Sequence, residues 1–486
     1  MNIRRISAVA LALLITAGAL QSCGGEKPET AADTAAAVTE PEQTETAEPR
    51  IDPGLPDIDL GGYIITFYGK KVTGVYAESL TGEIVNDAVY NRNIALNEKY
   101  NFEIVQVTPE NQTDPSTEIK NIVMAGEDAY QVLVDGGNRF VPYIQSGLLY
   151  DMNTLSHQDY SKPWWFDNMN KGLSLDGKLF MSASAFMLSP MQGIYHPFIN
   201  ADLAENYGVR IEDMYQTVRD DKWTVDKLID IIKLGGADLD GNGVMDQNDQ
   251  WGLTTEAYCG YVMTIGCGYQ IAKKDENDEP YLTVVSEESN EIWDRLCSQV
   301  FSDGNIFLAT QNIKGADNIW TTSSNIMAEG RSLVFYGGLG DGLRSYEYNF
   351  GVLPSPKFKE SQEYYYHTGS SWNNPLIAVP VTVADPDKVS LILEAMSYYS
   401  YYDVLPSFYQ DFMERKLVRD ERSIEMLHII NSSIFYDPGA VYNWGGCLNI
   451  LYEIVKSGVN NSATAFAKVE KSASKEIDKL MSAVRG

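Results

Sequence analysis

Positive charge is scarce in this chain, because 67 aspartates and glutamates stand against 37 lysines and arginines, for a formal net charge of −30. Nucleic acid binding needs a dense cluster of cations, so this balance excludes nucleic acid as a partner and a basic patch for anionic lipid. Four histidines and five cysteines leave little material for histidine catalysis or a zinc site. Hydrophobic residues still make up 44% of the chain, so it has enough apolar surface to build folded cores.

Long apolar runs are absent after the first twenty residues, so no transmembrane helix is predicted in the rest of the chain. Arg4 and Arg5 precede an apolar run, Ala8–Leu20, that has the length of a signal-peptide core. The run ends in Leu-Gln-Ser-Cys, which resembles the lipobox of bacterial lipoproteins. We therefore expect residues 1–22 to be a cleaved signal peptide and Cys23 to be lipidated. The mature protein would then lie in the cell envelope, extracytoplasmic and held to the membrane only through its lipid anchor. An ordinary secretory signal is the alternative.

The stretch after Cys23 is acidic and poor in large apolar side chains. Residues 24–60 carry ten acids and two cations. Such a segment cannot bury enough apolar surface to offset the entropy lost on ordering, so we expect residues 23–60 to form the lipidated cysteine and a disordered spacer.

The folded part begins near residue 61 and alternates strand and helix patterns. Apolar runs predict strands over 63–68, 102–107 and 130–134, and helical spacing predicts a helix over 83–99. This order is typical of an α/β lobe with a mainly parallel sheet, in which ligands lie beyond the carboxyl ends of the strands. A second series follows from about residue 191. It includes a helix N-capped by Thr224, strands over 333–336 and 349–353, and late helices over 389–399, 450–455 and 466–484.

An Asp-rich stretch of twelve residues has the spacing of a calcium-binding loop. It places oxygen side chains at positions 1, 3, 5, 9 and 12 and glycine at position 6. Calcium requires six to eight hard oxygen ligands gathered by a sharp turn, and position 7 supplies a backbone carbonyl. The ligands predicted for a structural Ca²⁺ are Asp238, Asp240, Asn242, Val244, Asp246 and Asp249. The alternative is a polar turn rich in Asp and Asn.

Motifs of enzymatic catalysis are missing from the sequence. It has no Gly-x-Ser-x-Gly, no His-Glu-x-x-His and no Walker A motif. The four cysteines after Cys23 are predicted to be buried thiols, with a Cys259–Cys267 bridge as the alternative. Since acids are plentiful, a glycosidase that uses a carboxylate pair stays open as a further alternative.

Aromatic side chains provide the best candidates for contact with a small solute. A ring face stacks on the C–H face of a sugar, while the sugar hydroxyls find polar partners; core packing is the alternative use of the same rings. Trp372 and Trp444 stand out because each lies in a turn rich in Gly or Asn. The candidate platforms are Tyr68, Trp164, Trp165, Tyr195, Trp372 and Trp444.

Several segments, in order, resemble the extracellular solute-binding proteins of family 1, the lipid-anchored receptors of carbohydrate ABC importers. The lipobox comes first. The segments that follow are Asn86–Tyr100, Tyr130–Gly136, Ser146–Met152, Leu175–Phe180, Trp223–Leu228, Gln250–Leu253, Glu329–Tyr336 and Phe350–Pro356.

The resemblance implies an α/β, two-lobed type II periplasmic-binding fold that closes by a hinge over a solute. It implies a first lobe of residues 61–185 and 370–435 and a second lobe of residues 186–369 and 436–486. The chain would cross between the lobes near 182–195 and 365–376, and the C-terminal helices would pack on the second lobe. The cleft would be lined by Tyr68, Asp135, Gly136, Arg139, Tyr195, Gly338, Asp341, Trp372 and Trp444.

The function that this resemblance implies is solute capture without catalysis. A monomeric lipoprotein would bind a small solute, most often a sugar or oligosaccharide, and deliver it to ABC transporter permease subunits. Two alternatives stay open, a surface glycoside hydrolase or lyase and a calcium-stabilised adhesion lipoprotein.

Overall fold

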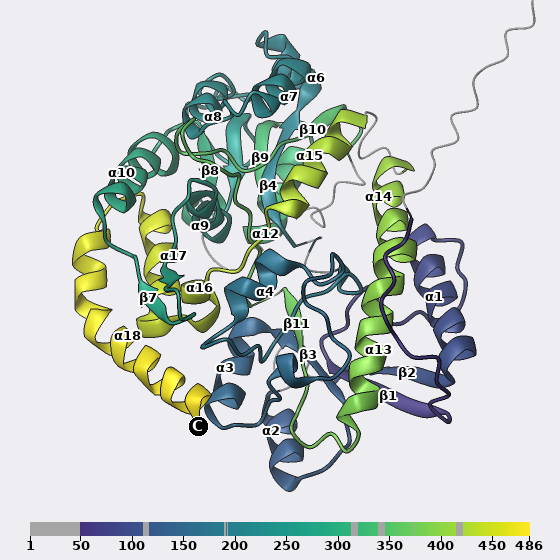
Figure 1. Cartoon of the computed structure of the whole chain (residues 1–486). Coiled ribbons are helices and arrows are strands. Elements are labelled where there is room, and N and C mark those ends of the chain that lie inside the picture. The colour runs from purple at the N-terminus through teal and green to yellow at the C-terminus, as the bar shows by residue number, and fades with distance from the viewer. Residues whose placement is uncertain are drawn as a thin grey trace, which may run out of the picture. The chain divides into compact units, whose positions relative to one another are not determined.

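The structure, a computed structural model, describes residues 49–109, 116–188, 191, 193–312, 319–338, 346–372, 374–414 and 421–486. The chain divides into two units, Met1–Arg50 and Ile51–Gly486. Of the first unit only Pro49 and Arg50 are described, and both are exposed. The predicted signal peptide and Cys23 lie outside the described residues. All elements below belong to the second unit, in which two sheets are each flanked by helices (Figure 1).

The first sheet has the strand order β11-β3-β1-β2. Strands β1 (Tyr63–Gly69), β2 (Phe102–Val107) and β3 (Val132–Gly136) are parallel, as the sequence predicts, and β11 (Pro375–Ala378) joins them antiparallel to β3. All of β3 and the second half of β1 are buried, because helices cover both faces of a parallel sheet. Its helices are α1 (Ile84–Tyr100), α2 (Ser116–Ala125), α3 (Gly137–Gln145), η1 (Met152–Thr154), α4 (Asp167–Leu173), α13 (Pro386–Tyr399), η4 (Ser400–Val404) and α14 (Leu405–Glu414).

The second sheet has the strand order β10-β4-β9-β5-β8. Its parallel part is β8 (Ile306–Leu308), β5 (Trp251–Thr255) and β9 (Ser332–Gly338), while β4 (Tyr195–Asn200) runs antiparallel to both β9 and β10 (Phe350–Val352). Its helices and its hairpin are α6 (Ala201–Asn206), α7 (Ile211–Arg219), α8 (Val225–Ile232), α9 (Ala257–Gly266), β6 (Ala272–Lys274), β7 (Pro280–Leu282), α10 (Glu287–Leu296), η2 (Cys297–Phe301), α11 (Ala309–Asn312) and α12 (Ile319–Ala328). Thr224 is the N-cap residue of α8, but its side chain makes no capping hydrogen bond.

The C-terminal helices contact both groups of elements. They are α15 (Glu421–Ser432), α16 (Pro438–Tyr442), η5 (Trp444–Gly446), α17 (Cys447–Ser457) and α18 (Ser462–Arg485). Helix α17 packs on α9 of the second lobe, whereas α18 contacts α10 of the second lobe and α3 of the first. Phe466 of α18 belongs to a core with α9 and α10 residues, and Ile477 and Leu480 belong to a core with α3 residues. Because its buried face continues over six turns, α18 spans the two lobes instead of packing on the second alone (Figure 1).

The chain passes between the two sheets along segments that pair with one another. Ser182 pairs with Ile377 of β11, and Ile194 pairs with Gly369. His367 pairs in parallel with Ile434, just after α15. The His367 ring is buried; its Nε2 accepts from the Ser355 amide at 2.7 Å and its Nδ1 lies 2.7 Å from Ser433 Oγ. Burial holds the pKa of His367 well below its usual value, so the ring stays neutral and serves these hydrogen bonds.

One buried carboxylate in the first lobe, Glu394, accepts hydrogen bonds from two buried tryptophans. Trp164 and Trp165, two of the candidate ligand platforms, are fully buried, and their indole nitrogens donate to the two oxygens of Glu394 at 2.7 and 2.6 Å. Their rings therefore serve core packing. Burial raises the pKa of Glu394 to about 7, against the opposing effect of the two indole hydrogen bonds.

Two further expectations concern thiols and membrane spans. Cys259, Cys267, Cys297 and Cys447 are all buried and free, so the prediction of thiols is confirmed and no Cys259–Cys267 bridge forms. Over the ranges that the structure describes, no helix is long and apolar enough to cross a membrane. Residues 51–60, placed in the spacer by the sequence, have no helix or strand, but Leu60 is buried and its amide donates to the Tyr100 carbonyl at 2.8 Å.

Replacing Glu394 with Gln should flatten the dependence of stability on pH. The folded pKa near 7 exceeds the ordinary value of 4.5, so the folded state binds the extra proton between these values. Stability from this group is thus present below pH 4.5 and is lost as the pH rises to 7, by up to about 3 kcal/mol. Urea unfolding at pH 5 and pH 8 measures the difference. Equal pH dependence in Glu394→Gln and the parent chain would contradict a raised pKa.

Candidate functional site

The candidate site lies at the carboxyl ends of β1 and β3, which neighbour each other in the first sheet. The Lys70 amide, one residue after β1, donates to the Val134 carbonyl of β3 at 2.9 Å, which fixes Lys70 beside Asp135. Asp135 Oδ1 lies 3.6 Å from Lys70 Nζ and 3.6 Å from Arg139 Nε, and it accepts from the Gly136 amide at 2.7 Å. The sequence named Asp135 and Arg139 as ligand residues, and the structure brings them together with Lys70.

Burial dominates the electrostatics of this cluster. Asp135 is 1% exposed, and burial raises its pKa against the Gly136 amide and the two cations, which lower it. Burial likewise lowers the pKa of Lys70, against the attraction of Asp135. Both charged forms therefore lack part of their solvation, so their mutual contacts matter more than those of a surface ion pair. A polar solute at this place would meet oriented charges that water does not fully screen.

The segment Gly369–Trp372 crosses over these strand ends. Lys70 Nζ donates to the Trp372 carbonyl, and the Asn138 amide donates to the Ser371 carbonyl at 3.5 Å. A Cβ on Gly136 would lie 2.3 Å from the Trp372 carbonyl oxygen, so glycine is required there for the segment to approach. The Trp372 side chain is 41% exposed and has a ring available to a solute.

The second lobe reaches the same segment through α9. Tyr258 Oη accepts from the Ser371 amide at 3.3 Å, and its ring packs edge-on against Tyr195 of β4, with 6.0 Å between ring centroids. Tyr195 is the register partner of Gly338, the last residue of β9. Ser371 and Trp372 are thus held from one side by Lys70 and from the other by Tyr258. Asp341 lies outside the described residues.

Sequence reasoning missed Tyr258 and Glu256. Both directly follow β5, whose carboxyl end lies beside that of β9, and Glu256 caps α9 by accepting from the amides of Tyr258 and Cys259 at 2.8 and 2.7 Å. The sequence analysis did not predict the strand Trp251–Thr255. The end of that strand was the signal that could have pointed to these two residues.

Two predicted ligand residues lie elsewhere. Tyr68 is 1% exposed and stacks face to face on Tyr130, with ring centroids 4.0 Å apart. Trp444 is 2% exposed and stacks on Tyr442 at 5.1 Å. Both rings have their faces covered by protein, so the expectation that they line the cleft is corrected: their rings pack in the core.

The predicted calcium loop gathers three carboxylates. Ligand atoms of Asp238, Asp240 and Asp249 all lie within 4.8 Å of one another, and Asp249 is buried. Arg331, one residue before β9, donates to the carbonyls of Gln247 and Asp249 at 2.8 Å each and so fixes the end of the loop.

The other predicted calcium ligands are bonded within the loop, and Asn242 donates from its side chain to Asp240 Oδ2 at 2.7 Å. Asn242 Oδ1 accepts from the Val244 amide at 2.7 Å, and Asp246 Oδ1 accepts from the Asn248 amide at 2.7 Å. Val244 is 62% exposed. The carboxylates of Asp238, Asp240 and Asp249 accept from amides of the same loop, and they are the carboxylates whose ligand atoms converge.

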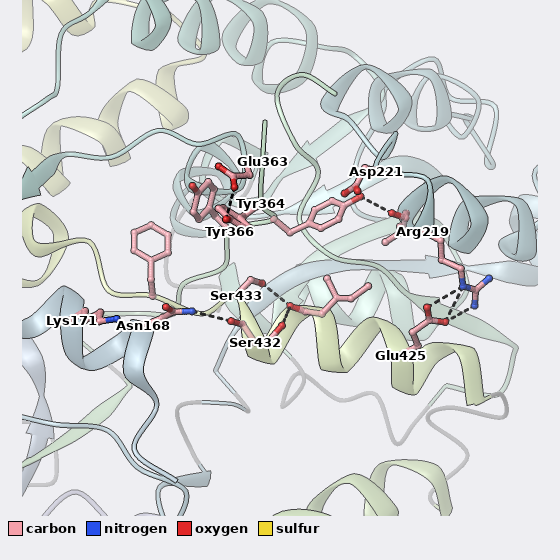
Figure 2. Close-up of a pocket in the computed structure, with 14 residues that line it drawn as sticks. Asn168, Lys171, Arg219, Asp221, Glu363, Tyr364, Tyr366, Glu425, Ser432 and Ser433 are labelled. Atoms are coloured by element: carbon pink, nitrogen blue, oxygen red, sulfur yellow. Dashed lines mark hydrogen bonds and ion pairs between the residues drawn. The ribbon is translucent and has the colours of Figure 1, made fainter. Parts of the chain in front are cut away.

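A cavity of about 940 Å³ lies apart from the strand-end cluster and shares no lining residue with it. Figure 2 shows α4 on one side, α15 along the floor, and Tyr364 and Tyr366 opposite. The lining residues are Asn168, Lys171, Val218, Arg219, Asp221, Glu363, Tyr364, Tyr365, Tyr366, Glu425, Ile429, Ser432, Ser433 and Phe435.

Comparison with known proteins shows similarity at the level of the fold. No protein-family model and no curated sequence matches the chain. A cyclo/maltodextrin-binding protein, crystallised with maltotetraose, is 13% identical with a TM-score of 0.54, over 87% of this chain and 96% of that one. UspC of M. tuberculosis is 17% identical with a TM-score of 0.56, over 85% of this chain and 100% of that one. Together with the two parallel-rich sheets, these similarities show that the chain adopts the two-lobed type II periplasmic-binding fold.

Proposed function

We propose that the protein is a non-enzymatic, extracytoplasmic solute-binding lipoprotein that captures a sugar or oligosaccharide and delivers it to the permease of an ABC transporter. The observation that carries this proposal is the set of side chains around Ser371 and Trp372, which come from both lobes of a binding-protein fold. A closing hinge would bring such groups onto one solute from two sides. The similarity in fold to a protein crystallised with maltotetraose supports a saccharide as the solute.

The chemistry of the cluster also suits a saccharide. Lys70 and Arg139 can donate hydrogen bonds to hydroxyl groups, the buried Asp135 carboxylate orients these two cations, and the Trp372 ring offers an apolar face. A pyranose ring presents both kinds of surface at once, with C–H groups on its faces and hydroxyl groups around its edge. A permease partner and a lipid on Cys23 belong to the same proposal and rest on the lipobox and the fold.

We further propose that the loop 238–249 binds a structural calcium ion. Three converging carboxylates supply hard oxygen ligands, and their mutual repulsion would be relieved by a divalent cation. Asp238, Asp240 and Asp249 would hold the ion, and its effect would be to stabilise the turn that leads into β5.

Trp372→Ala should weaken saccharide binding about tenfold, the loss expected for one stacking ring, or about 1.4 kcal/mol. Isothermal calorimetry with maltotetraose and other neutral oligosaccharides measures it. Tyr281→Ala is the matched control, because Tyr281 is 48% exposed and lies in β7. Wild-type affinity in Trp372→Ala, or no binding of any saccharide by the parent chain, would refute the proposed solute site.

Calcium should raise the melting temperature by a few degrees, since binding to the folded state alone at 100 times Kd adds about 2.7 kcal/mol. EDTA should remove that gain. Asp240→Asn should abolish the response, because it removes one of the three gathered carboxylates. Asp240 is exposed, so this change should leave the core folded. Asp230→Asn, at an exposed position of α8, is the control and should keep the response. A melting temperature that changes with neither calcium nor EDTA would count against the calcium site.

Cys23→Ala should release the protein from the membrane fraction if the anchor is a lipid on that thiol. Mass spectrometry of the mature N-terminus should find a diacylglyceryl group on Cys23. A soluble parent protein cleaved at another position would support the ordinary secretory signal instead.

A further inference from the structure

The cavity in Figure 2 lies where the two lobes meet beside the crossing segments, outside the proposed solute site. Asn168 and Lys171 come from α4, whose Asn170 side chain bonds Ser182 and Ala183 of the first lobe. Val218 and Arg219 come from α7 of the second lobe. The Asn168 amide nitrogen donates to the Ser432 carbonyl at 3.1 Å, which closes one side of the cavity. Its volume, about 940 Å³, is that of a pocket for a drug-sized molecule.

Aromatic rings form one wall of the cavity. Tyr365 is 7% exposed, and its hydroxyl donates to the Val218 carbonyl at 3.2 Å. Tyr366 packs edge-on against Phe435, with 5.5 Å between ring centroids. Tyr364 is 58% exposed. A wall of this kind contacts the apolar face of a ring-shaped ligand.

The charged side chains around the cavity are already paired with one another or with neighbours. Arg219 lies 2.5 Å from Glu425 (Figure 2), Lys171 lies 2.6 Å from Asp167, and Asp221 lies 2.7 Å from Lys357. An anionic ligand would have to compete with one of these pairs, and it would also meet Glu363, a carboxylate that accepts from the Tyr364 hydroxyl. A neutral ligand keeps all of them and can still bond their remaining lone pairs and N–H groups.

We propose that this cavity is a second ligand site, which takes a neutral saccharide. Its rings lie against Tyr364 and Tyr366, and its hydroxyls bond the paired carboxylates, Arg219 and the side chain of Ser432. A saccharide fits better than a purely aromatic molecule, because the latter would cover these polar groups without replacing their hydrogen bonds to water. The site is independent of the proposed solute site, from which it differs in every residue.

The test uses a fluorophore on the rim of the cavity in the full chain. Lys171 is 73% exposed at its side chain, and the four cysteines after residue 23 are buried, so Lys171→Cys combined with Cys23→Ser allows selective labelling. The probes are methyl α-D-glucopyranoside, maltotetraose, cellotetraose and, as an anionic comparison, galacturonic acid.

A neutral saccharide should change the fluorescence with a midpoint that rises about tenfold in Tyr364→Ala. Tyr76→Ala, which removes a ring of 44% exposure outside the cavity, and Trp372→Ala should leave that midpoint unchanged. Tyr364 and Tyr76 are both exposed, so neither variant should be destabilised. An unchanged melting temperature of each variant verifies that it is folded.

Three results would overturn the second site. They are a midpoint that follows Trp372→Ala instead of Tyr364→Ala, a tighter response to galacturonic acid than to every neutral saccharide, and no response to any neutral saccharide. Failure of the proposed solute site would give a different result. Saccharide affinity measured by calorimetry would then be unchanged in Trp372→Ala, while the fluorescent response would remain.

Discussion

The pairing of the crossing segments fixes the position of the candidate site between the two lobes. Ile194 pairs with Gly369 and His367 pairs with Ile434, so the passages between the lobes are tied together at one place. Ser371 and Trp372 follow directly after that place and are therefore held at the edge of both lobes. The neutral His367 ring secures this arrangement from inside, through Ser355 and Ser433.

The parallel strands of each sheet bring the side chains of the candidate site together beside the crossing segments. Because the carboxyl ends of neighbouring parallel strands meet at one edge, Lys70 after β1 and Asp135 in β3 become neighbours although they are far apart in sequence. The same rule brings the end of β5 beside the end of β9 in the second lobe, which places Tyr258 and Gly338 near Tyr195. Each lobe thus contributes its strand ends to one side of the crossing segment.

Features carried by local sequence could be predicted, and features set by packing could not. The strand 102–107 agrees with β2 because its apolar run and its flanks are local signals. The convergence of Asp238, Asp240 and Asp249 also follows from spacing within one loop. The covering of Tyr68 by Tyr130 depends on the face of β1 that bears Tyr68 and on a partner 62 positions away, which a turn pattern does not contain. Helix α18 shows the same limit, because Phe466 near its start packs in one core and Ile477 and Leu480 near its end pack in the other.

The antiparallel strand β11 has a consequence for the order in which the first sheet forms. Pro375 pairs with Gly136, so the edge of β3 in the first sheet stays open until this distant segment of the chain has joined it. Contacts between such distant segments form slowly, since a long loop must close first. The N-terminal strands would therefore wait with one exposed edge, a state prone to pairing with other chains. Completion of the first sheet thus depends on a strand that lies more than 200 residues after β3 in the chain.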